Sequence, residues 1–275
     1  MSRWILGLSV TVLLALPAAA QDRRPSHCIS LVQNTPGIEV AQAGGFMDPL
    51  PDWTIRLRFL GHAMFLLTTP EGHTAVTDYS GFVGPVDFVP DVVTMNNAHS
   101  THWTATPDPR IPHVLPGWNP EGGPADRFLE LGDMVVRSVS TDIRSYGGGR
   151  REDGNSIFVF EVAGLCVGHL GHLHHIPTDE QFAALGRLDV VMAPVDGGYT
   201  MSLDAMVATL QRLRSSVVIP MHWFGGASLE RFLIDIAGDF VIERREGHSL
   251  EVSLSTLPKR PTVVVLEPSY LRADE

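Results

Sequence analysis

Histidines at the ends of apolar segments are the residues of this sequence best placed to do chemistry. The chain has 12 histidines. Six of them come at or just after the end of a segment with the pattern of a β-strand: His62, His99, His102, His169, His172 and His222. The C-terminal ends of neighbouring parallel strands meet at one edge of a sheet, where α/β proteins bind ligands. One such histidine is usually structural, but several at one edge predict a shared site.

A cluster of neutral imidazoles indicates a metal centre. Imidazole is a preferred ligand of zinc, and a catalytic zinc site has about three protein ligands and one position open to water. We expect the metal ligands to be His99, His102, His169, His172 and His222. Zinc is the expected cofactor, as one ion in preference to two, and another divalent metal would suit the same donors.

Short apolar segments must position these histidines. Residues 53–78 alternate apolar and polar side chains on both sides of a turn at residues 70–72, which predicts an antiparallel meander. Apolar residues at helical spacing predict helices over residues 202–213 and 229–236. Further strands are expected at residues 91–95, 134–139, 156–162, 165–167, 189–195, 216–220, 240–243 and 250–254. This alternation of strands and helices predicts a mixed α/β fold.

The N-terminal residues have the pattern of an export signal. Arg3 precedes an apolar run that ends in three alanines at residues 18–20, which predicts a cleaved signal peptide over residues 1–20. The alternative is an uncleaved membrane anchor, although the run is short for a full span. We expect an irregular arm at residues 21–52, one domain at residues 53–275, and a periplasmic or secreted protein without membrane contact after cleavage.

Composition limits the partners of the chain. Its formal net charge of −11 disfavours nucleic acid as a partner, because nucleic-acid-binding proteins usually carry a basic face. A small-molecule substrate is expected, and the oligomeric state stays open. Two cysteines remain after the leader, Cys28 and Cys166. They could pair in an oxidising compartment or remain two separate buried thiols.

Several short motifs occur in an order that resembles the metallo-β-lactamase superfamily. They are Gly61-His62-Ala63, Thr77-Asp78, Gly154-Asn155-Ser156, His169-Leu170-Gly171, residues 194–201 and Pro220-Met221-His222. The pattern is most similar to the lactonase-like branch that includes L-ascorbate 6-phosphate lactonase, and it extends over residues 53–223. The resemblance implies an αβ/βα four-layer sandwich with a metal site at one edge, between the two sheets.

The chain departs from the metal-binding motif of that superfamily. The family's His-x-His-x-Asp-His falls at residues 97–102, where Asn97 replaces the first histidine and Thr101 replaces the aspartate. His172 stands where the family has a metal-bridging aspartate. A neutral imidazole cannot bridge two closely spaced cations as a carboxylate does, so one altered metal centre is expected. Carried over by position, His99 and His169 would serve one metal position, His102 and His222 the other, and His172 either.

The resemblance also implies an activity and catalytic residues. Metal-activated water would attack an ester, lactone or amide bond. We assign Asp78, His62 and His172 to catalysis: Asp78 would brace an imidazole by accepting its N–H, and His62 would stabilise an oxyanion or only pack. Tyr199 would line the site or shape its turn. The alternative is a non-catalytic binding protein that retains the fold.

Overall fold

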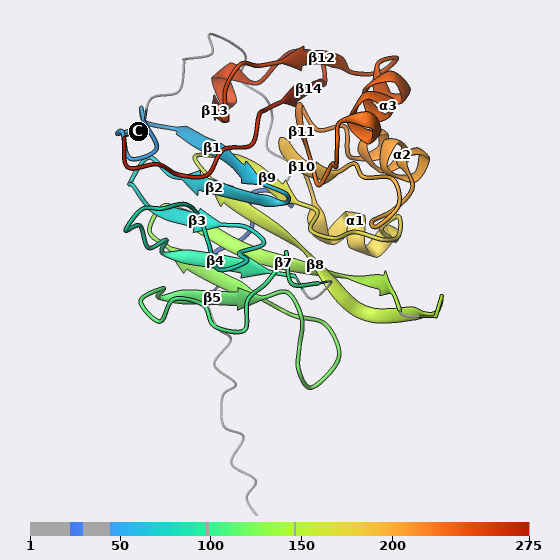
Figure 1. Ribbon diagram of the computed structural model, residues 1–275, viewed down its shortest axis with the longest axis horizontal. Coiled ribbons are helices and arrows are strands. Elements are labelled where there is room, and N and C mark those ends of the chain that lie inside the picture. Colours follow the sequence, from blue (N-terminus) through green and yellow to red (C-terminus); the bar gives the residue numbers. More distant parts are fainter. Residues whose placement is uncertain (1–22, 30–44, 97–98, 146, 275) are drawn as a thin grey trace, which may run out of the picture.

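Two β-sheets packed face to face form the body of the protein (Figure 1). The computed structural model describes residues 23–29, 45–96, 99–145 and 147–274. The expected signal peptide and Asn97 therefore lie outside the described residues. The prediction of a mixed α/β sandwich is confirmed.

The first sheet has six strands in the order β13-β1-β2-β3-β4-β5. Its strands are β1 (Thr54–Gly61), β2 (Met64–Thr68), β3 (Thr74–Val76), β4 (Val92–Met95), β5 (His113–Pro116) and β13 (Ser249–Ser253). Strands β1, β2 and β3 form the predicted antiparallel meander, whereas β3, β4 and β5 are parallel. Strands β1, β3 and β4 therefore all end at the same edge.

The second sheet has eight strands in the order β12-β14-β11-β10-β9-β8-β7-β6. Its strands are β6 (Phe128–Leu131), β7 (Met134–Arg144), β8 (Arg150–Val162), β9 (Leu165–His169), β10 (Val190–Pro194), β11 (Val217–Met221), β12 (Val241–Arg244) and β14 (Thr262–Val265). Strands β9, β10 and β11 are parallel neighbours. Their C-terminal ends bring histidines to one edge, as the sequence predicted.

Three helices cover the outer face of the eight-stranded sheet, on the side of β10 and β11 (Figure 1). They are α1 (Asp179–Leu185), α2 (Leu203–Leu213) and α3 (Ala227–Ile236). Thr178 begins α1 with a capping box, in which its side chain accepts from Gln181 and the Gln181 side chain accepts in return. Within the described residues, no helix has both the length and the apolar character needed to cross a bilayer.

Alternate residues of the central strands pack into different cores. In β10, Val190 and Met192 face the six-stranded sheet, whereas Val191 and Ala193 face the helices. A third core lies on the outer face of the six-stranded sheet, where loop residues such as Phe46 and Tyr79 cover it. The fourth layer of the expected sandwich is thus made of loop segments in the part of the chain that the structure describes. Burial of a large apolar side chain contributes about 1.5–3 kcal/mol, so these layers hold the strands in register.

A disulfide joins the N-terminal arm to the domain. Cys28 and Cys166 of β9 are bonded across a separation of 138 residues. The adjoining Ser26 Oγ donates to Glu161 Oε1 at 2.5 Å, and the same buried carboxylate accepts from Arg137 Nε at 2.7 Å. The bond and these contacts fasten the described residues 23–29 of the arm to the eight-stranded sheet.

The disulfide should contribute strongly to stability, because it closes a long loop in the unfolded chain. Its reduction, or the substitution Cys28→Ser, is expected to lower the free energy of unfolding by about 3–5 kcal/mol. Urea unfolding with and without reductant measures this difference. Cys28→Ser serves as the control, because added reductant should not change its stability further. Equal midpoints for the oxidised and reduced wild-type protein would contradict the expectation.

Candidate metal centre

Three buried imidazoles meet at the edge where the strands end. His102 Nε2 lies 3.1 Å from His222 Nε2 and 3.0 Å from His172 Nδ1. All three side chains are buried. His102 follows β4 of the first sheet, whereas His172 follows β9 and His222 follows β11 of the second. The cluster therefore lies between the two sheets.

In two of these rings, a carboxylate lies beside Nδ1, the nitrogen that points away from the cluster. Asp78 Oδ2 is hydrogen-bonded to His102 Nδ1 at 2.5 Å, and Asp196 Oδ2 lies 2.9 Å from His222 Nδ1, where its charge attracts the N–H although the geometry is not that of a hydrogen bond. Burial raises the pKa of Asp78, and the hydrogen bond that Asn96 Nδ2 donates to its other oxygen at 2.8 Å opposes this by favouring the ionised carboxylate. Each imidazole then carries its proton on Nδ1, as histidine ligands of metals do when a carboxylate orients them.

This tautomer makes the site suitable for a cation. With their protons on Nδ1, His102 and His222 direct Nε2 lone pairs at each other across 3.1 Å. Two facing acceptors repel unless a proton or a metal ion lies between them. Nitrogen ligands at about 2.0–2.1 Å from a tetrahedral zinc ion would be about 3.3–3.4 Å apart, close to the spacing observed here. The donor set thus fits one transition-metal ion of the zinc type.

Two further histidines extend the cluster towards solvent. Ligand atoms of His62, His99, His102 and His222 all lie within 4.8 Å of one another. Thr101 Oγ1 lies 2.9 Å from His62 Nε2 and 2.7 Å from His99 Nδ1. The residue at the position of the family's aspartate therefore links two imidazoles through its hydroxyl. His62, which the sequence placed at the rim, is part of the cluster itself.

His169 lies apart from the cluster although it ends the same sheet edge. Its Nε2 donates to the carbonyl oxygen of Ala63 at 2.7 Å, and its Nδ1 accepts from the N–H of Gly171 at 3.2 Å. Both nitrogens are thus engaged with backbone, and the ring joins β9 to the turn between β1 and β2. The structure gives it a structural position, whereas the sequence predicted a ligand.

The backbone is in the left-handed region at three residues of the site. His62, Asp78 and His222 have φ values of 52°, 44° and 56°. Such values are uncommon for residues other than glycine, and they cluster at functional sites. The N–H of His222 donates to the carbonyl oxygen of His62 at 2.7 Å, which joins the ends of β11 and β1. The fold thus fixes the direction of these side chains through the backbone.

The surroundings keep the imidazoles neutral. Burial, reinforced by His222 and His102, lowers the pKa of His62 to about 3. Burial and neighbouring histidines likewise lower the pKa of His102 and that of His172 well below the usual range. Neutral imidazole is the form that binds metal. Without a metal, the rings of His62, His102 and His172 therefore each keep a lone pair at neutral pH.

Two supporting residues were missed in the sequence. Burial alone would raise the pKa of Asp196, but its contact with His222 and hydrogen bonds from Thr200 outweigh it and hold this pKa below its usual range. Asn96 connects the sheets, because its Oδ1 accepts from the N–H of Ser156 at 2.8 Å while its amide supports Asp78. Asp196 follows the end of β10 and Asn96 follows the end of β4. This position after a strand is the signal in the sequence that could have identified them.

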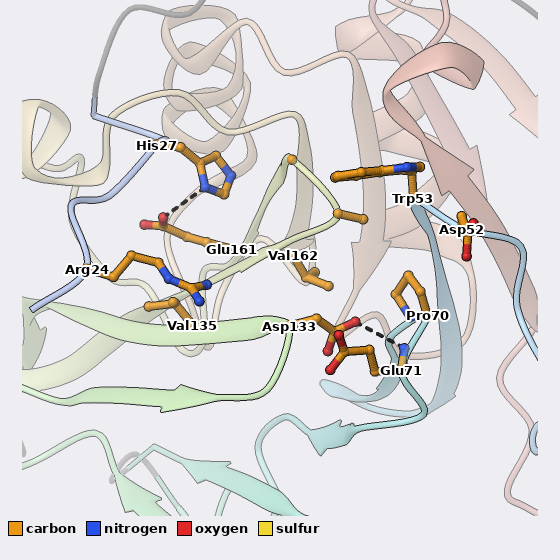
Figure 2. A pocket seen from close by; sticks show the side chains of 12 residues that line it. Arg24, His27, Asp52, Trp53, Pro70, Glu71, Asp133, Val135, Glu161 and Val162 are labelled. Atoms are coloured by element: carbon orange, nitrogen blue, oxygen red, sulfur yellow. Dashed lines mark hydrogen bonds and ion pairs between the residues drawn. The ribbon is translucent and has the colours of Figure 1, made fainter.

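A pocket of about 550 Å³ lies elsewhere in the molecule (Figure 2). Trp53 and Gly164 line it, and they precede β1 and β9. Both strands begin at this pocket and end at the histidine cluster. The pocket is therefore at the opposite end of the sandwich and does not form part of the candidate metal centre.

Residues 56–222 of the chain match the family model described as a β-lactamase superfamily domain. A UPF0173 metal-dependent hydrolase from Thermoplasma acidophilum is 24% identical over 62% of this chain and 83% of its own length. Another, from Methanoregula boonei, is 26% identical over 62% of this chain and 82% of its own length. The matched range includes the histidine cluster.

Solved structures of similar fold include proteins described as metal-dependent hydrolases. A Thermotoga maritima protein, described as a Zn-dependent hydrolase of the metallo-β-lactamase superfamily, is 27% identical with a TM-score of 0.56. The match covers 78% of this chain and 99% of that protein. Igni18, a metallo hydrolase from Ignicoccus hospitalis, has a similar fold, with a TM-score of 0.53 at 18% identity over 78% of this chain and 96% of its own.

The contrasting positions of His102 and His169 give a matched test of the metal site. Both imidazoles are fully buried, so their removal leaves comparable cavities. His102→Ala should reduce zinc affinity by at least about 100-fold, whereas His169→Ala should retain stoichiometric zinc. Elemental analysis and competition with a chelator measure the difference. Equal loss of zinc in both variants would contradict a structural role for His169, and His169→Gln repeats the comparison if the alanine variant fails to fold.

The neutral histidines should make the metal-free protein sensitive to acid. The folded-state pKa of His62, about 3, lies below the value of 6.5 expected when unfolded, so its stability contribution is complete above pH 6.5 and lost as the pH falls. We expect the free energy of unfolding to fall by about 1–2 kcal/mol between pH 7 and pH 5, after allowance for solvent screening. Urea titrations measure this, and a constant value would contradict it. His62→Asn, which tolerates the left-handed backbone, should show a smaller decrease.

Proposed function

Since this chain belongs to the metallo-β-lactamase superfamily, we propose that it is a metal-dependent hydrolase that cleaves an ester, lactone or amide bond. Its relatives are named metal-dependent hydrolases. The two Nε2 lone pairs that face each other, on His102 and His222, carry the proposal, because a metal ion between them would relieve their repulsion.

The donor set favours one zinc ion. His102 and His222 would hold it, with His172, His62 and His99 within reach as further imidazole donors. Imidazole suits zinc and similar transition metals, whereas magnesium and calcium prefer oxygen ligands. When bound, such an ion lowers the pKa of water and polarises a carbonyl group. The clustered donors are all imidazoles, which supports one ion and not a carboxylate-bridged pair.

The protein's own residues would orient the reactants and handle the protons. Asp78, by a hydrogen bond, and Asp196, by its charge, would favour protons on the Nδ1 atoms of His102 and His222, so that both Nε2 atoms remain directed into the site. His62 is neutral at pH 7 and half-buried beside the cluster, where it would hydrogen-bond a developing oxyanion. His99 is exposed and linked to Thr101, so it is placed to pass a proton to solvent.

We further propose that the protein works outside the cytoplasm, in the periplasm or as a secreted protein. The leader at residues 1–20 has the pattern of a signal peptide. The Cys28–Cys166 disulfide is consistent with an oxidising compartment. Both observations support export without depending on the chemistry of the metal site.

A binding protein without catalytic activity is the second candidate. Thr101 stands where the family has an aspartate beside its metal, and its hydroxyl contacts His62 and His99. A hydroxyl cannot act as the carboxylate base that would orient an attacking water. The same cluster could therefore bind a metal ion and a carbonyl ligand without turnover.

Activity of the zinc-loaded protein on small ester, lactone and amide substrates tests the proposal. We expect turnover that a chelator abolishes and zinc restores, and Asp196→Asn should lower kcat/KM by about 10–100-fold, since it no longer orients His222. Arg231→Gln, on the exposed face of α3, is the control and should leave activity unchanged. Stoichiometric zinc without turnover would favour the binding protein, whereas failure to bind any divalent metal would contradict both candidates.

A further inference from the structure

Two exposed aromatic side chains stand beside the histidine cluster. The ring centroid of Phe224 lies 5.3 Å from that of His222 and 5.6 Å from that of His62. The ring of Tyr199 packs against Phe224 at 5.7 Å in a T-shaped contact. Phe224 and Tyr199 are 52% and 69% exposed, although both are large. We call these two residues the aromatic pair.

The loop that carries Tyr199 is held from both sides. One oxygen of Asp196 accepts from the backbone N–H groups of Gly198, Tyr199 and Thr200, at 2.8, 2.5 and 3.0 Å. The Nη2 of Arg144 donates to the carbonyl oxygens of the same three residues, each at 2.7 Å. These bonds hold the loop backbone in place, so the exposed ring of Tyr199 projects from a fixed point beside Phe224.

Exposure of two adjoining rings has a free-energy cost that binding can recover. Apolar surface left in water is unfavourable, and exposed apolar patches with a polar rim mark ligand or protein contacts. Here the ring of Phe224 lies beside two imidazoles of the cluster, those of His62 and His222, and Tyr199 extends this apolar surface away from the cluster. A substrate contact explains this location better than a general protein interface does.

Local charge favours a neutral group against the rings. Hydrogen bonds keep Asp196, which supports the Tyr199 loop, in its ionised form. The Nη2 of nearby Arg144 is already engaged by three carbonyl oxygens. An anionic group on the substrate would be repelled by the charge of this nearby, buried carboxylate, whereas an alkyl chain or an aromatic ring would displace only water.

We propose that Phe224 and Tyr199 form the subsite for an apolar, uncharged part of the substrate, a medium-length acyl chain or an aromatic ring next to the bond that is cleaved. This inference rests on the proposed function for the reaction, because the metal centre defines where the carbonyl lies. The subsite itself binds through the rings and can be tested without turnover.

Phe224→Ala in the zinc-loaded full chain tests the subsite by kinetics. With p-nitrophenyl octanoate, KM should rise about 10-fold or more, because the acyl chain loses its apolar contact. With p-nitrophenyl acetate, KM should change less than about 2-fold. Phe82→Ala is the matched control: Phe82 is also 52% exposed and contacts another ring, that of Tyr270 at 5.3 Å. Equal changes for both esters, or an equal effect of Phe82→Ala, would overturn the subsite.

Calorimetric binding of octanoate and acetate separates the subsite from the reaction. Octanoate should bind the wild-type protein more tightly than acetate does, and Phe224→Ala should remove the difference. If this holds without turnover of any ester, the subsite stands and the hydrolase proposal fails. If esters are cleaved without preference for chain length, the hydrolase stands and the subsite fails. If the wild-type protein sediments as a dimer and the Phe224→Ala variant as a monomer, the ring belongs to a protein interface and the subsite is overturned.

Discussion

The proton shared by a buried carboxylate and an imidazole is the constraint on which this site depends. Asp78 shares it with His102 in a hydrogen bond, and the charge of Asp196, 2.9 Å from His222 Nδ1, favours the proton at the same position of that ring. Each carboxylate comes from the same sheet as the histidine that it orients: Asp78 follows β3 near β4, and Asp196 follows β10 near β11. The two sheets thus each contribute one prepared imidazole. The cluster therefore forms only when the two sheets pack with these strand ends next to each other.

The contacts between the sheets serve the same requirement. His169 donates to Ala63, the N–H of His222 donates to His62, and Asn96 accepts from the N–H of Ser156. All three contacts cross from one sheet to the other at the edge with the histidines. Buried backbone groups there would be costly to leave without partners. The polar groups that close the sandwich therefore also set the distance between the two prepared imidazoles.

The sequence predicted which segments meet but not how each side chain is directed. Strand ends marked His102, His172 and His222 correctly as residues of one edge, and the antiparallel meander and both longer helices were predicted near their observed positions. His169 carries the same signal, yet it ends β9 with its ring directed at a backbone carbonyl group. His62 joins the cluster because its backbone is left-handed, a conformation that residue type alone does not reveal.

Asp196 serves two parts of the molecule with its two oxygens. One oxygen faces His222, and the other accepts from the backbone that carries Tyr199. A single carboxylate therefore contacts both the metal position and the loop of the aromatic pair. If an occupied metal site strengthens binding at the rings, thermodynamic linkage requires that a ligand on the rings strengthens metal binding by the same free energy. Metal retention in this protein would then depend on the concentration of the compound that it recognises.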